Sequence, residues 1–178
     1  PRTWDGFKAF CADRAGGKLA GECLIRAGRK RLAFLGDTEA PELRERYKGL
    51  CDAAREAGLP EPALFHVHLA SDTMAGEIAG HIDSIRKAVD GIACGSDLIA
   101  MQTVRILADH AISVPQDISV TGFDDLPLAE RTVPRLTTIS QNVPQGAKEM
   151  VRLLFERIAG EDSPSVEMAP QLMMRDTV

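Results

Sequence analysis

The chain has 178 residues, of which 44% are hydrophobic and 26% charged, a balance typical of a folded globular protein rather than a disordered one. Its net charge of −5 disfavours a module that binds nucleic acid directly, because such modules usually carry a basic face. The length suits one α/β domain, or one domain with part of another. No secretory signal and no apolar stretch near membrane-spanning length is present, so we expect no membrane association.

Short apolar runs alternate with amphipathic stretches along the whole chain. In chain order we expect a strand at 8–13, a helix at 16–27, a strand at 31–36, a helix at 41–57, a strand at 63–69, a helix at 72–89, a strand at 91–94, a helix at 97–110, strands at 118–122 and 136–140, a helix at 144–159 and a last extended piece at 171–175. Pro41 and Pro144 suit first helical turns, and Gly58 suits a helix C-terminus. The alternation predicts an α/β fold with a doubly wound parallel sheet.

The cysteines form no CxxC pair, which disfavours a zinc ribbon or a redox motif. Each lies in an apolar strand or helix pattern. We therefore expect buried free thiols, as in a protein of the reducing cytoplasm. The four residues are Cys11, Cys23, Cys51 and Cys94.

Polar residues follow the expected strands at one edge of the sheet, where doubly wound folds bind ligands. They are Asp13, residues 37–42, Ser71 with Asp72, Ser96 with Asp97, and Asp124 with Asp125. A simpler interpretation of Asp72 and Asp97 is that they cap helices, each worth about 1 kcal/mol. One member of the Asp124–Asp125 pair could serve only to organise the following turn.

Arg46 lies one turn inside the helix expected at 41–57, near the same edge. Its guanidinium offers five donors in a fixed fork, which could hold adjacent hydroxyls or a carboxylate. The alternative is a solvated charge that shares a helix face with Glu42, four residues earlier.

The sequence gives little support for a metal site, a phosphate-binding loop or a hydrolase active site. His66 and His68 alternate on a strand, but no third ligand shows metal-site spacing, so no metal is expected. Gly16 and Gly17 belong to no phosphate-binding motif, and no GxSxG elbow occurs. The sequence therefore predicts no cofactor and no enzymatic activity.

Several stretches resemble, in order, the motifs of the LacI/GalR transcriptional regulators. The most specific is VPQDISVTGFDD at 114–125, which is similar to the family's VPxDISVVGFDD signature. Further matches are RLAFLG at 31–36, RYKGL at 46–50, DGIACGSD at 90–97 with Ala100, LTTISQ at 136–141, and residues 13–17 with 24–28. The chain is identified as a member of this family's effector-binding, periplasmic-binding-protein-like part, truncated and without the DNA-binding domain.

The resemblance implies two doubly wound lobes that close on a small effector. It divides the chain into a remnant of the first lobe (1–28), the second lobe (29–140), a returning helix of the first lobe (141–165) and a closing segment of the second lobe (166–178). We expect one complete lobe, and exposed apolar faces on the remnants of the other unless a partner or a swap covers them.

The resemblance also implies roles for individual residues. Arg46 would bind ligand hydroxyls and Asp124 would accept from them, while Gln141 and Asp13 would line the opposing side. Ser96 stands where the family carries a cleft asparagine.

Ser71 stands where sugar-binding members often carry a stacking aromatic side chain. The chain contains one Trp and one Tyr, so an aromatic platform for a sugar is not expected, and an effector other than a plain hexose is plausible.

The leading hypothesis is a cytoplasmic sensor domain that binds a small polar, sugar-like effector, whose binding alters operator affinity by shifting dimer geometry. DNA would be contacted only by the missing domain. The homodimer would use helix 97–110 and the loop 126–134, although the inward half of that helix should pack on the sheet.

A periplasmic solute-binding protein is the alternative, against which the free cysteines and the GFDD and LTTISQ motifs argue. An enzyme ranks third.

Overall fold

The computed structural model describes residues 9–69, 72–161 and 164–178. Its elements are β1 (Ala9–Cys11), α1 (Asp13–Arg26), β2 (Leu32–Leu35), α2 (Pro41–Glu56), β3 (Ala63–Phe65), α3 (Met74–Gly80), α4 (Ile82–Ala88), β4 (Gly91–Cys94), α5 (Asp97–Asp109), β5 (Ser119–Asp124), β6 (Thr137–Ser140), α6 (Val143–Ile158), β7 (Val166–Met168) and β8 (Gln171–Met173). Within these residues, no helix combines the length and the apolar character needed to cross a membrane.

Six strands form the main sheet, in the order β3-β2-β4-β5-β6-β8. All neighbouring strands run parallel except β6 and β8, which are antiparallel. The chain leaves β2 through α2 to reach β3 at the edge, and returns through α3 and α4 to β4 on the other side of β2. This arrangement confirms the predicted doubly wound, mostly parallel sheet.

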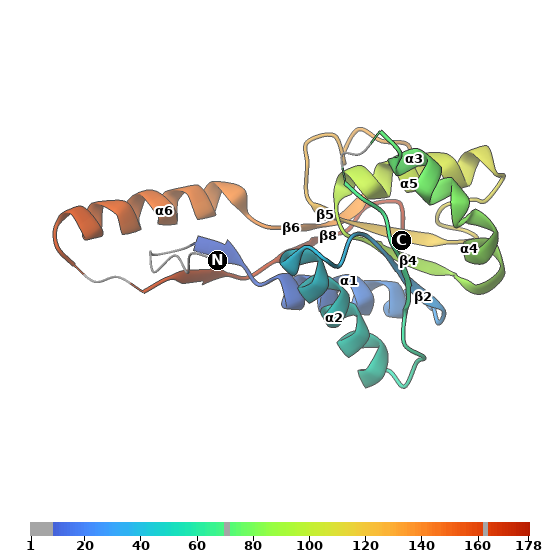
Figure 1. Ribbon diagram of the computed structural model, residues 1–178, viewed down its shortest axis with the longest axis horizontal. Coiled ribbons are helices and arrows are strands. Elements are labelled where there is room, and N and C mark those ends of the chain that lie inside the picture. The colour runs from blue at the N-terminus through green and yellow to red at the C-terminus, as the bar shows by residue number, and fades with distance from the viewer. Residues whose placement is uncertain (1–8, 70–71, 162–163) are drawn as a thin grey trace.

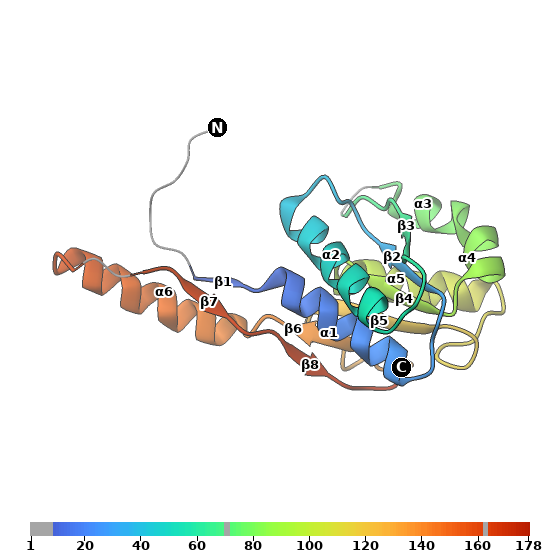
Figure 2. The same ribbon diagram turned by 90° about the horizontal axis from the view of Figure 1, so that it is seen from below.

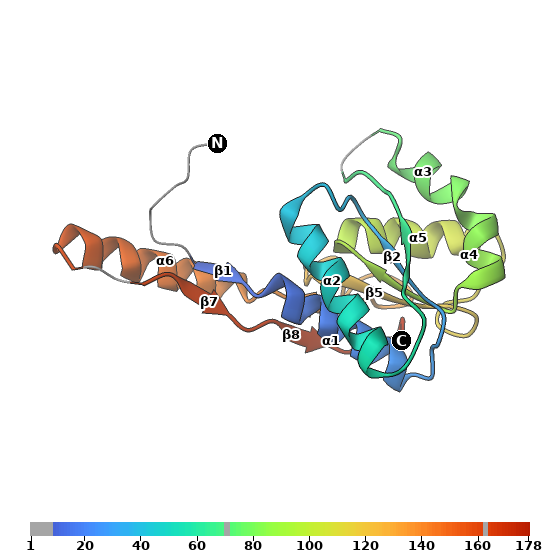
Figure 3. The same ribbon diagram turned by 60° about the horizontal axis from the view of Figure 1, so that its bottom comes forward.

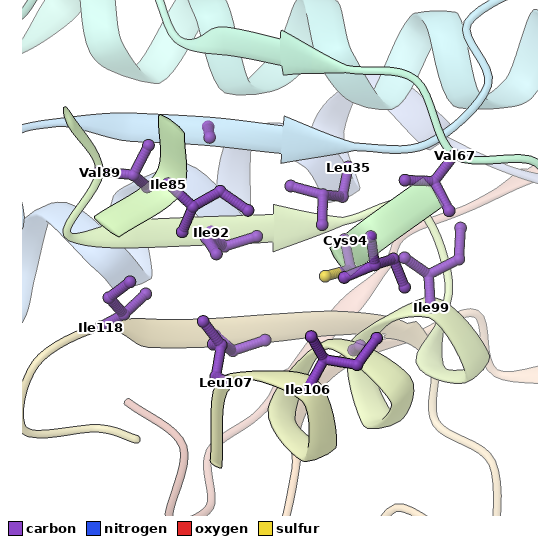
Figure 4. Packing of buried hydrophobic residues seen from close by; sticks show 14 of the residues in the cluster. Leu35, Val67, Ile85, Val89, Ile92, Cys94, Ile99, Ile106, Leu107 and Ile118 are labelled. Atoms are coloured by element: carbon purple, nitrogen blue, oxygen red, sulfur yellow. The ribbon is translucent and has the colours of Figure 1, made fainter. Parts of the chain in front are cut away.

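Helices cover both faces of the sheet, with α1 and α2 on one side and α3, α4 and α5 on the other (Figure 1). Under α3–α5 lies a core of aliphatic side chains in which Leu35, Ile92 and Leu107 are fully buried (Figure 4). A second core, under α1 and α2, includes Phe34 and Phe123. Each fully buried side chain of this kind contributes about 1.5–3 kcal/mol, so the two cores hold the sheet between its helical layers.

Helices α1 and α2 lie side by side across their face of the sheet (Figure 3). A Cβ atom on Gly17 would lie 1.9 Å from the carbonyl oxygen of Arg46, and one on Gly49 would lie 2.0 Å from that of Arg14. Only glycine allows two helix backbones to approach so closely. A Cβ on Gly16 would lie 2.7 Å from the Phe123 ring, so the Gly16–Gly17 pair serves helix packing.

The elements β1, β7 and α6 form an arm that projects from the six-stranded body (Figures 1 and 2). β1 and β7 pair in parallel as a separate two-stranded sheet. On α6, Leu153 is buried, but a set of large apolar side chains is 41–72% exposed: Val143, Met150, Val151, Leu154, Phe155 and Ile158. The arm therefore presents a long apolar surface of the kind that usually contacts another part of a protein.

Most expected elements lie within a few residues of their predicted bounds, but three differ. The strand expected at 63–69 ends at Phe65. The helix expected at 72–89 is divided at His81, whose N–H donates to the carbonyl oxygen of Ile78, one residue nearer than in an α-helix. The strand Val166–Met168 was not expected at all.

The contacts also divide the chain differently from the expected lobes. Helix α1, expected in the first-lobe remnant at 1–28, packs on α2 and on strands of the large sheet, because its glycines allow that close approach. Val166–Met168, expected in the closing segment 166–178, pairs with β1 in the arm. Only Gln171–Met173 joins the large sheet. The chain thus passes between arm and body at Ala12, between β6 and α6, and between β7 and β8.

Candidate functional site

Polar residues from five segments lie at the carboxyl edge of the large sheet. Side-chain contacts link four of them, and the fifth, Ser96, follows Gly95, whose carbonyl oxygen accepts from Arg46. The five residues come from the starts of α1 and α5, the first half of α2, the end of β5 and the residue after β6. The strand order reverses between β2 and β4 at this edge, which is where doubly wound folds bind ligands. The residues are Asp13, Arg46, Ser96, Asp124 and Gln141.

Arg46 is the centre of this group. Its Nε donates to Oδ1 of Asp13 at 2.8 Å, and its Nη1 donates to the carbonyl oxygen of Gly95 at 2.7 Å. Nη1 also lies 3.8 Å from Oδ1 of Asp124. Among the described residues, none accepts a hydrogen bond from Nη2. Arg46 is therefore fixed by Asp13 and Gly95, not by Glu42. The N–H groups of its Nη2 are not used in hydrogen bonds to the described residues.

The Arg46 side chain is buried, and its surroundings fix its orientation. Its side chain is only 7% exposed, and its guanidinium carbon lies 3.6 Å from the centroid of the Phe123 ring. A desolvated cation over an aromatic face is stabilised by about 2 kcal/mol. Because a buried charge is costly unless paired, Asp13 and Asp124 are needed to balance it. The side chain is held in place rather than solvated.

Asp124 ends β5 with a φ of 117°, a conformation that L-residues rarely adopt. Its Oδ1 accepts a hydrogen bond from Nε2 of Gln141 at 2.5 Å. Burial raises the pKa of Asp124, while the nearby Arg46 charge and the Gln141 hydrogen bond oppose that shift. The carboxyl is 29% exposed and so can accept hydrogen bonds from a ligand.

Ser96, and not Asp97 as expected, caps α5. Oγ of Ser96 accepts from the N–H of Ile99 at 3.3 Å, so Ser96 is the N-cap of α5. Asp97, expected as that cap, is fully buried: it accepts from Oγ1 of Thr138 at 2.5 Å and from the N–H of Leu126 at 2.7 Å. Burial raises the pKa of Asp97 to about 6.

Two further predictions concern the segment before α3. The N-cap of α3 is Thr73, without a side-chain cap hydrogen bond, so the prediction that Asp72 caps this helix is wrong. Ser71 lies outside the described residues.

Arg175 is a residue of this region that the sequence analysis missed. Its side chain is 8% exposed, and its Nη2 donates to Oδ1 of Asp125 at 2.7 Å. Asp125 is thus the member of the carboxylate pair that organises the turn, while Asp124 points to Arg46. No local pattern marks Arg175, because its partners lie 39–50 residues away in the sequence.

The chemistry of the site suits binding. Arg46 brings one positive charge against the carboxylates of Asp13 and Asp124, so the group presents hydrogen-bond donors and acceptors side by side. Within the described part of the chain, no three His, Cys, Asp or Glu side chains are grouped so as to hold a metal ion. The described cysteines are free thiols, as expected, and three of them are buried.

A separate hollow of about 720 Å³ opens beside α5, away from Arg46. It is bounded by the outer side of α5, the turn at 111–116 and the loop before β6, with Met101, Val104, Ile112 and Val133 among its lining residues. These segments lie toward the amino edge of the sheet. Val133 itself is 95% exposed. The hollow is mostly apolar in its lining and lies on the surface that the sequence analysis assigned to dimerisation.

A buried arginine beside two carboxylates at the switch point of a doubly wound sheet is the kind of polar group at which folds of this type bind small molecules. Residues 22–178 match the periplasmic binding protein-like domain, and the chain belongs to this family.

Similar proteins are bacterial regulators. The HTH-type transcriptional repressor PurR of Vibrio parahaemolyticus is 34% identical over 92% of this chain, and the HTH-type transcriptional regulator CelR of Thermobifida fusca is 30% identical over 91% of it. The matched regions are 50% and 49% of those proteins, so the chain spans about half the length of the curated relatives it matches. These relatives are named as transcriptional regulators and not as enzymes.

Solved structures of similar fold are also those of bacterial transcriptional regulators. A CelR–cellobiose complex has a TM-score of 0.87 at 27% identity, covering 97% of this chain and 54% of that chain. A periplasmic binding protein/LacI transcriptional regulator from Alkaliphilus metalliredigens, complexed with D-xylulofuranose, has a TM-score of 0.87 at 27% identity, covering 96% and 65%. The predicted resemblance to LacI/GalR regulators is confirmed.

Proposed function

We propose that this chain is the effector-binding sensor part of a LacI/GalR-type transcriptional regulator, and that Arg46 and Asp124 bind the effector. The observation that carries the proposal is the state of Arg46. It is buried and held by Asp13, Gly95 and Phe123, yet the N–H groups of its Nη2 donate to none of the described residues and so can donate to a ligand. A purely structural arginine at this depth would be expected to use its whole fork within the protein.

The effector we propose is a small, polar, sugar-like molecule. Asp124 and Asp13 can accept from hydroxyls, Gln141 can orient Asp124, and Arg46 can donate to a hydroxyl or ring oxygen. The ligands named in the two structures above, cellobiose and D-xylulofuranose, are polyhydroxy compounds of this kind. With two carboxylates against one guanidinium, a neutral ligand suits the site better than an anion.

We further propose that the site is one wall of a cleft between two lobes. The body, from Asp13 to Ser140 with β8 and the residues after it, is one lobe. The arm of β1, α6 and β7 belongs to the other, whose remaining elements would cover the apolar face of α6. Closure of the lobes on the effector would shift the regulator between two arrangements.

The partners we propose are a second copy of the chain and, through a separate DNA-binding domain, an operator in the cytoplasm. The second copy would sit on α5 and the loop 126–134, where the hollow and the exposed side chains of Leu128 and Val133 lie. The role is one of binding, without catalysis or a cofactor.

Arg46→Ala in the full-length protein tests the proposal. A thermal-shift screen of sugars, sugar acids, polyols and nucleosides first identifies a binding compound, and calorimetry then compares the variants. Loss of the direct charge-assisted contacts should weaken binding of that compound by at least about 100-fold, or about 3 kcal/mol, and abolish the response while operator binding persists. Arg55→Ala, a 72% exposed arginine near the other end of the same helix, is the matched control and should leave the affinity and the response unchanged. Unchanged affinity in Arg46→Ala would refute the assignment.

A further inference from the structure

The loop 126–134 connects the candidate site to the surface beside α5. It begins directly after Asp124 and Asp125 and leads into β6, and it carries the exposed side chains of Leu128 and Val133. Internal hydrogen bonds give it a defined shape: the N–H of Ala129 donates to the carbonyl oxygen of Leu126, and the N–H of Leu136 donates to that of Ala129. These hydrogen bonds tie the start and the middle of the loop to the residue that leads into β6.

Two buried charged side chains hold this loop. Asp97 accepts from the N–H of Leu126 at its first residue. Arg175 reaches three points: its Nη2 donates to Asp125 at 2.7 Å and to Glu130 at 3.1 Å, and its Nη1 donates to the carbonyl oxygen of Leu136 at 2.8 Å. A guanidinium fork can serve three acceptors at once, which an ammonium group on a flexible stem does far less well.

Neighbouring carboxylates point to different partners. Asp124 faces Arg46 and Gln141, and Asp125 faces Arg175. Both have positive φ angles, 117° and 56°, so the peptide between them is held in a sparsely populated conformation by the contacts at its two ends. The two carboxylates are therefore separated by a single peptide unit whose conformation depends on the contacts of both.

We propose that Arg175 is a positioning residue that couples the Asp124 carboxylate to the loop 126–134 through its ion pair with Asp125. The inference rests on the proposed function in one respect: the effector is what moves Asp124. The loop then carries that change to the α5 surface. Arg175 makes no contact with the effector and acts only through Asp125, Glu130 and Leu136.

Arg135 provides a matched control. Like Arg175, it links the segment after β8 to the end of this loop, and it pairs in a two-point fashion with Asp176 at 2.7 and 2.9 Å. Its side chain is 59% exposed, and its hydrogen bonds and its ion pair are with Asp176 and not with Asp125. Replacing Arg135 loosens the attachment of the segment after β8 to the end of the loop, but it leaves the ion pair between Arg175 and Asp125 in place.

The test is a double-mutant cycle on the full-length protein without any effector, read by amide hydrogen exchange in a peptide spanning 126–136. Asp124→Asn should raise exchange in this peptide at least threefold in the wild-type background. In Arg175→Met the peptide should already exchange faster, and Asp124→Asn should add less than a further 1.5-fold. In Arg135→Met the effect of Asp124→Asn should remain at least threefold. Exchange in α4 should stay unchanged throughout, which reports that the variants are folded.

Two outcomes would overturn the proposal. One is an Asp124→Asn effect of equal size with and without Arg175, and the other is no effect of Asp124→Asn on the loop at all. Arg175→Lys serves as the second variant if Arg175→Met does not fold, and it should reduce the Asp124→Asn effect by more than half. Because no effector is present, failure here leaves the Arg46 affinity experiment untouched, and failure of that experiment leaves this one readable.

Discussion

Gly17→Ala should disturb both the packing of α1 on α2 and the position of Arg46. The added Cβ would lie 1.9 Å from the carbonyl oxygen of Arg46, whereas ordinary contacts begin near 3.4 Å, so the two helices must separate by about 1.5 Å. The clash is with backbone atoms, which cannot turn aside as a flexible side chain can. The 2.8 Å hydrogen bond from Arg46 to Asp13 would not survive a shift of this size.

The expected loss of stability follows from two opposing effects. Overpacking of a tightly packed interior costs about 1–3 kcal/mol, and this contact with backbone belongs at the upper end. Alanine gains about 1 kcal/mol over glycine within a helix. We therefore expect Gly17→Ala to lower the free energy of unfolding by about 2 kcal/mol, measured by urea denaturation of the full-length protein.

Gly76→Ala is the matched control for this prediction. Gly76 lies inside α3, and a Cβ there would meet nothing within 4 Å, so the substitution should raise stability by about 1 kcal/mol. The two alanine variants should then differ by about 3 kcal/mol. If Gly17→Ala is as stable as Gly76→Ala, or binds the effector as tightly as the wild type, the close crossing does not position Arg46 in the way described.

Two further predictions concern Asp97 and the α5 surface. The pKa of Asp97 is raised by burial to about 6, above 3.8 in an unfolded chain, so the folded state takes up the proton first and stability rises as the pH falls through this window. The free energy of unfolding of the wild type, relative to Asp97→Asn, should therefore grow by about 2 kcal/mol from pH 7 to pH 4 in urea titrations, and a constant difference would contradict this. Val133→Asp, at a 95% exposed position, should weaken a homodimer through α5 at least tenfold in sedimentation without lowering domain stability. Leu69→Asp, exposed after β3, is its control, and equal dimerisation of both variants would exclude this surface.

The sequence predicts those features that local pattern determines. The alternation of apolar and amphipathic stretches was sufficient to predict the doubly wound sheet. The strand β4 was predicted with its observed bounds. The rule that ligands bind at the carboxyl ends of parallel strands selected Ser96 and Asp124, which follow or end strands of the large sheet. It also selected Asp13, which reaches the same edge from the start of α1 although β1 belongs to the two-stranded sheet. Arg46 and Gln141 needed the family resemblance as well, because an arginine early in a helix is more often solvated.

Features that depend on distant partners could not be predicted in this way. Asp97 and Ser96 are adjacent and both suit a helix N-terminus, and only the buried contacts of Asp97 with Thr138 and Leu126 decide which of them is the cap. Gly17 looks like any small residue until the backbone of Arg46 is placed against it. The strand β7 exists because β1 lies beside it, far away in the sequence.

Arg46 shows why the site can be at once rigid and responsive. Its Nε, its Nη1 and its aromatic contact face are used within the fold, on Asp13, Gly95 and Phe123, and its remaining donors are not. The free energy needed to desolvate and orient the guanidinium is therefore met during folding and is not subtracted from ligand binding. A side chain held in this way does not have to move when a ligand arrives. Under the proposed function, the response must then arise in Asp124, whose strained backbone leads to Asp125 and Arg175, and in closure of the arm's lobe over the site.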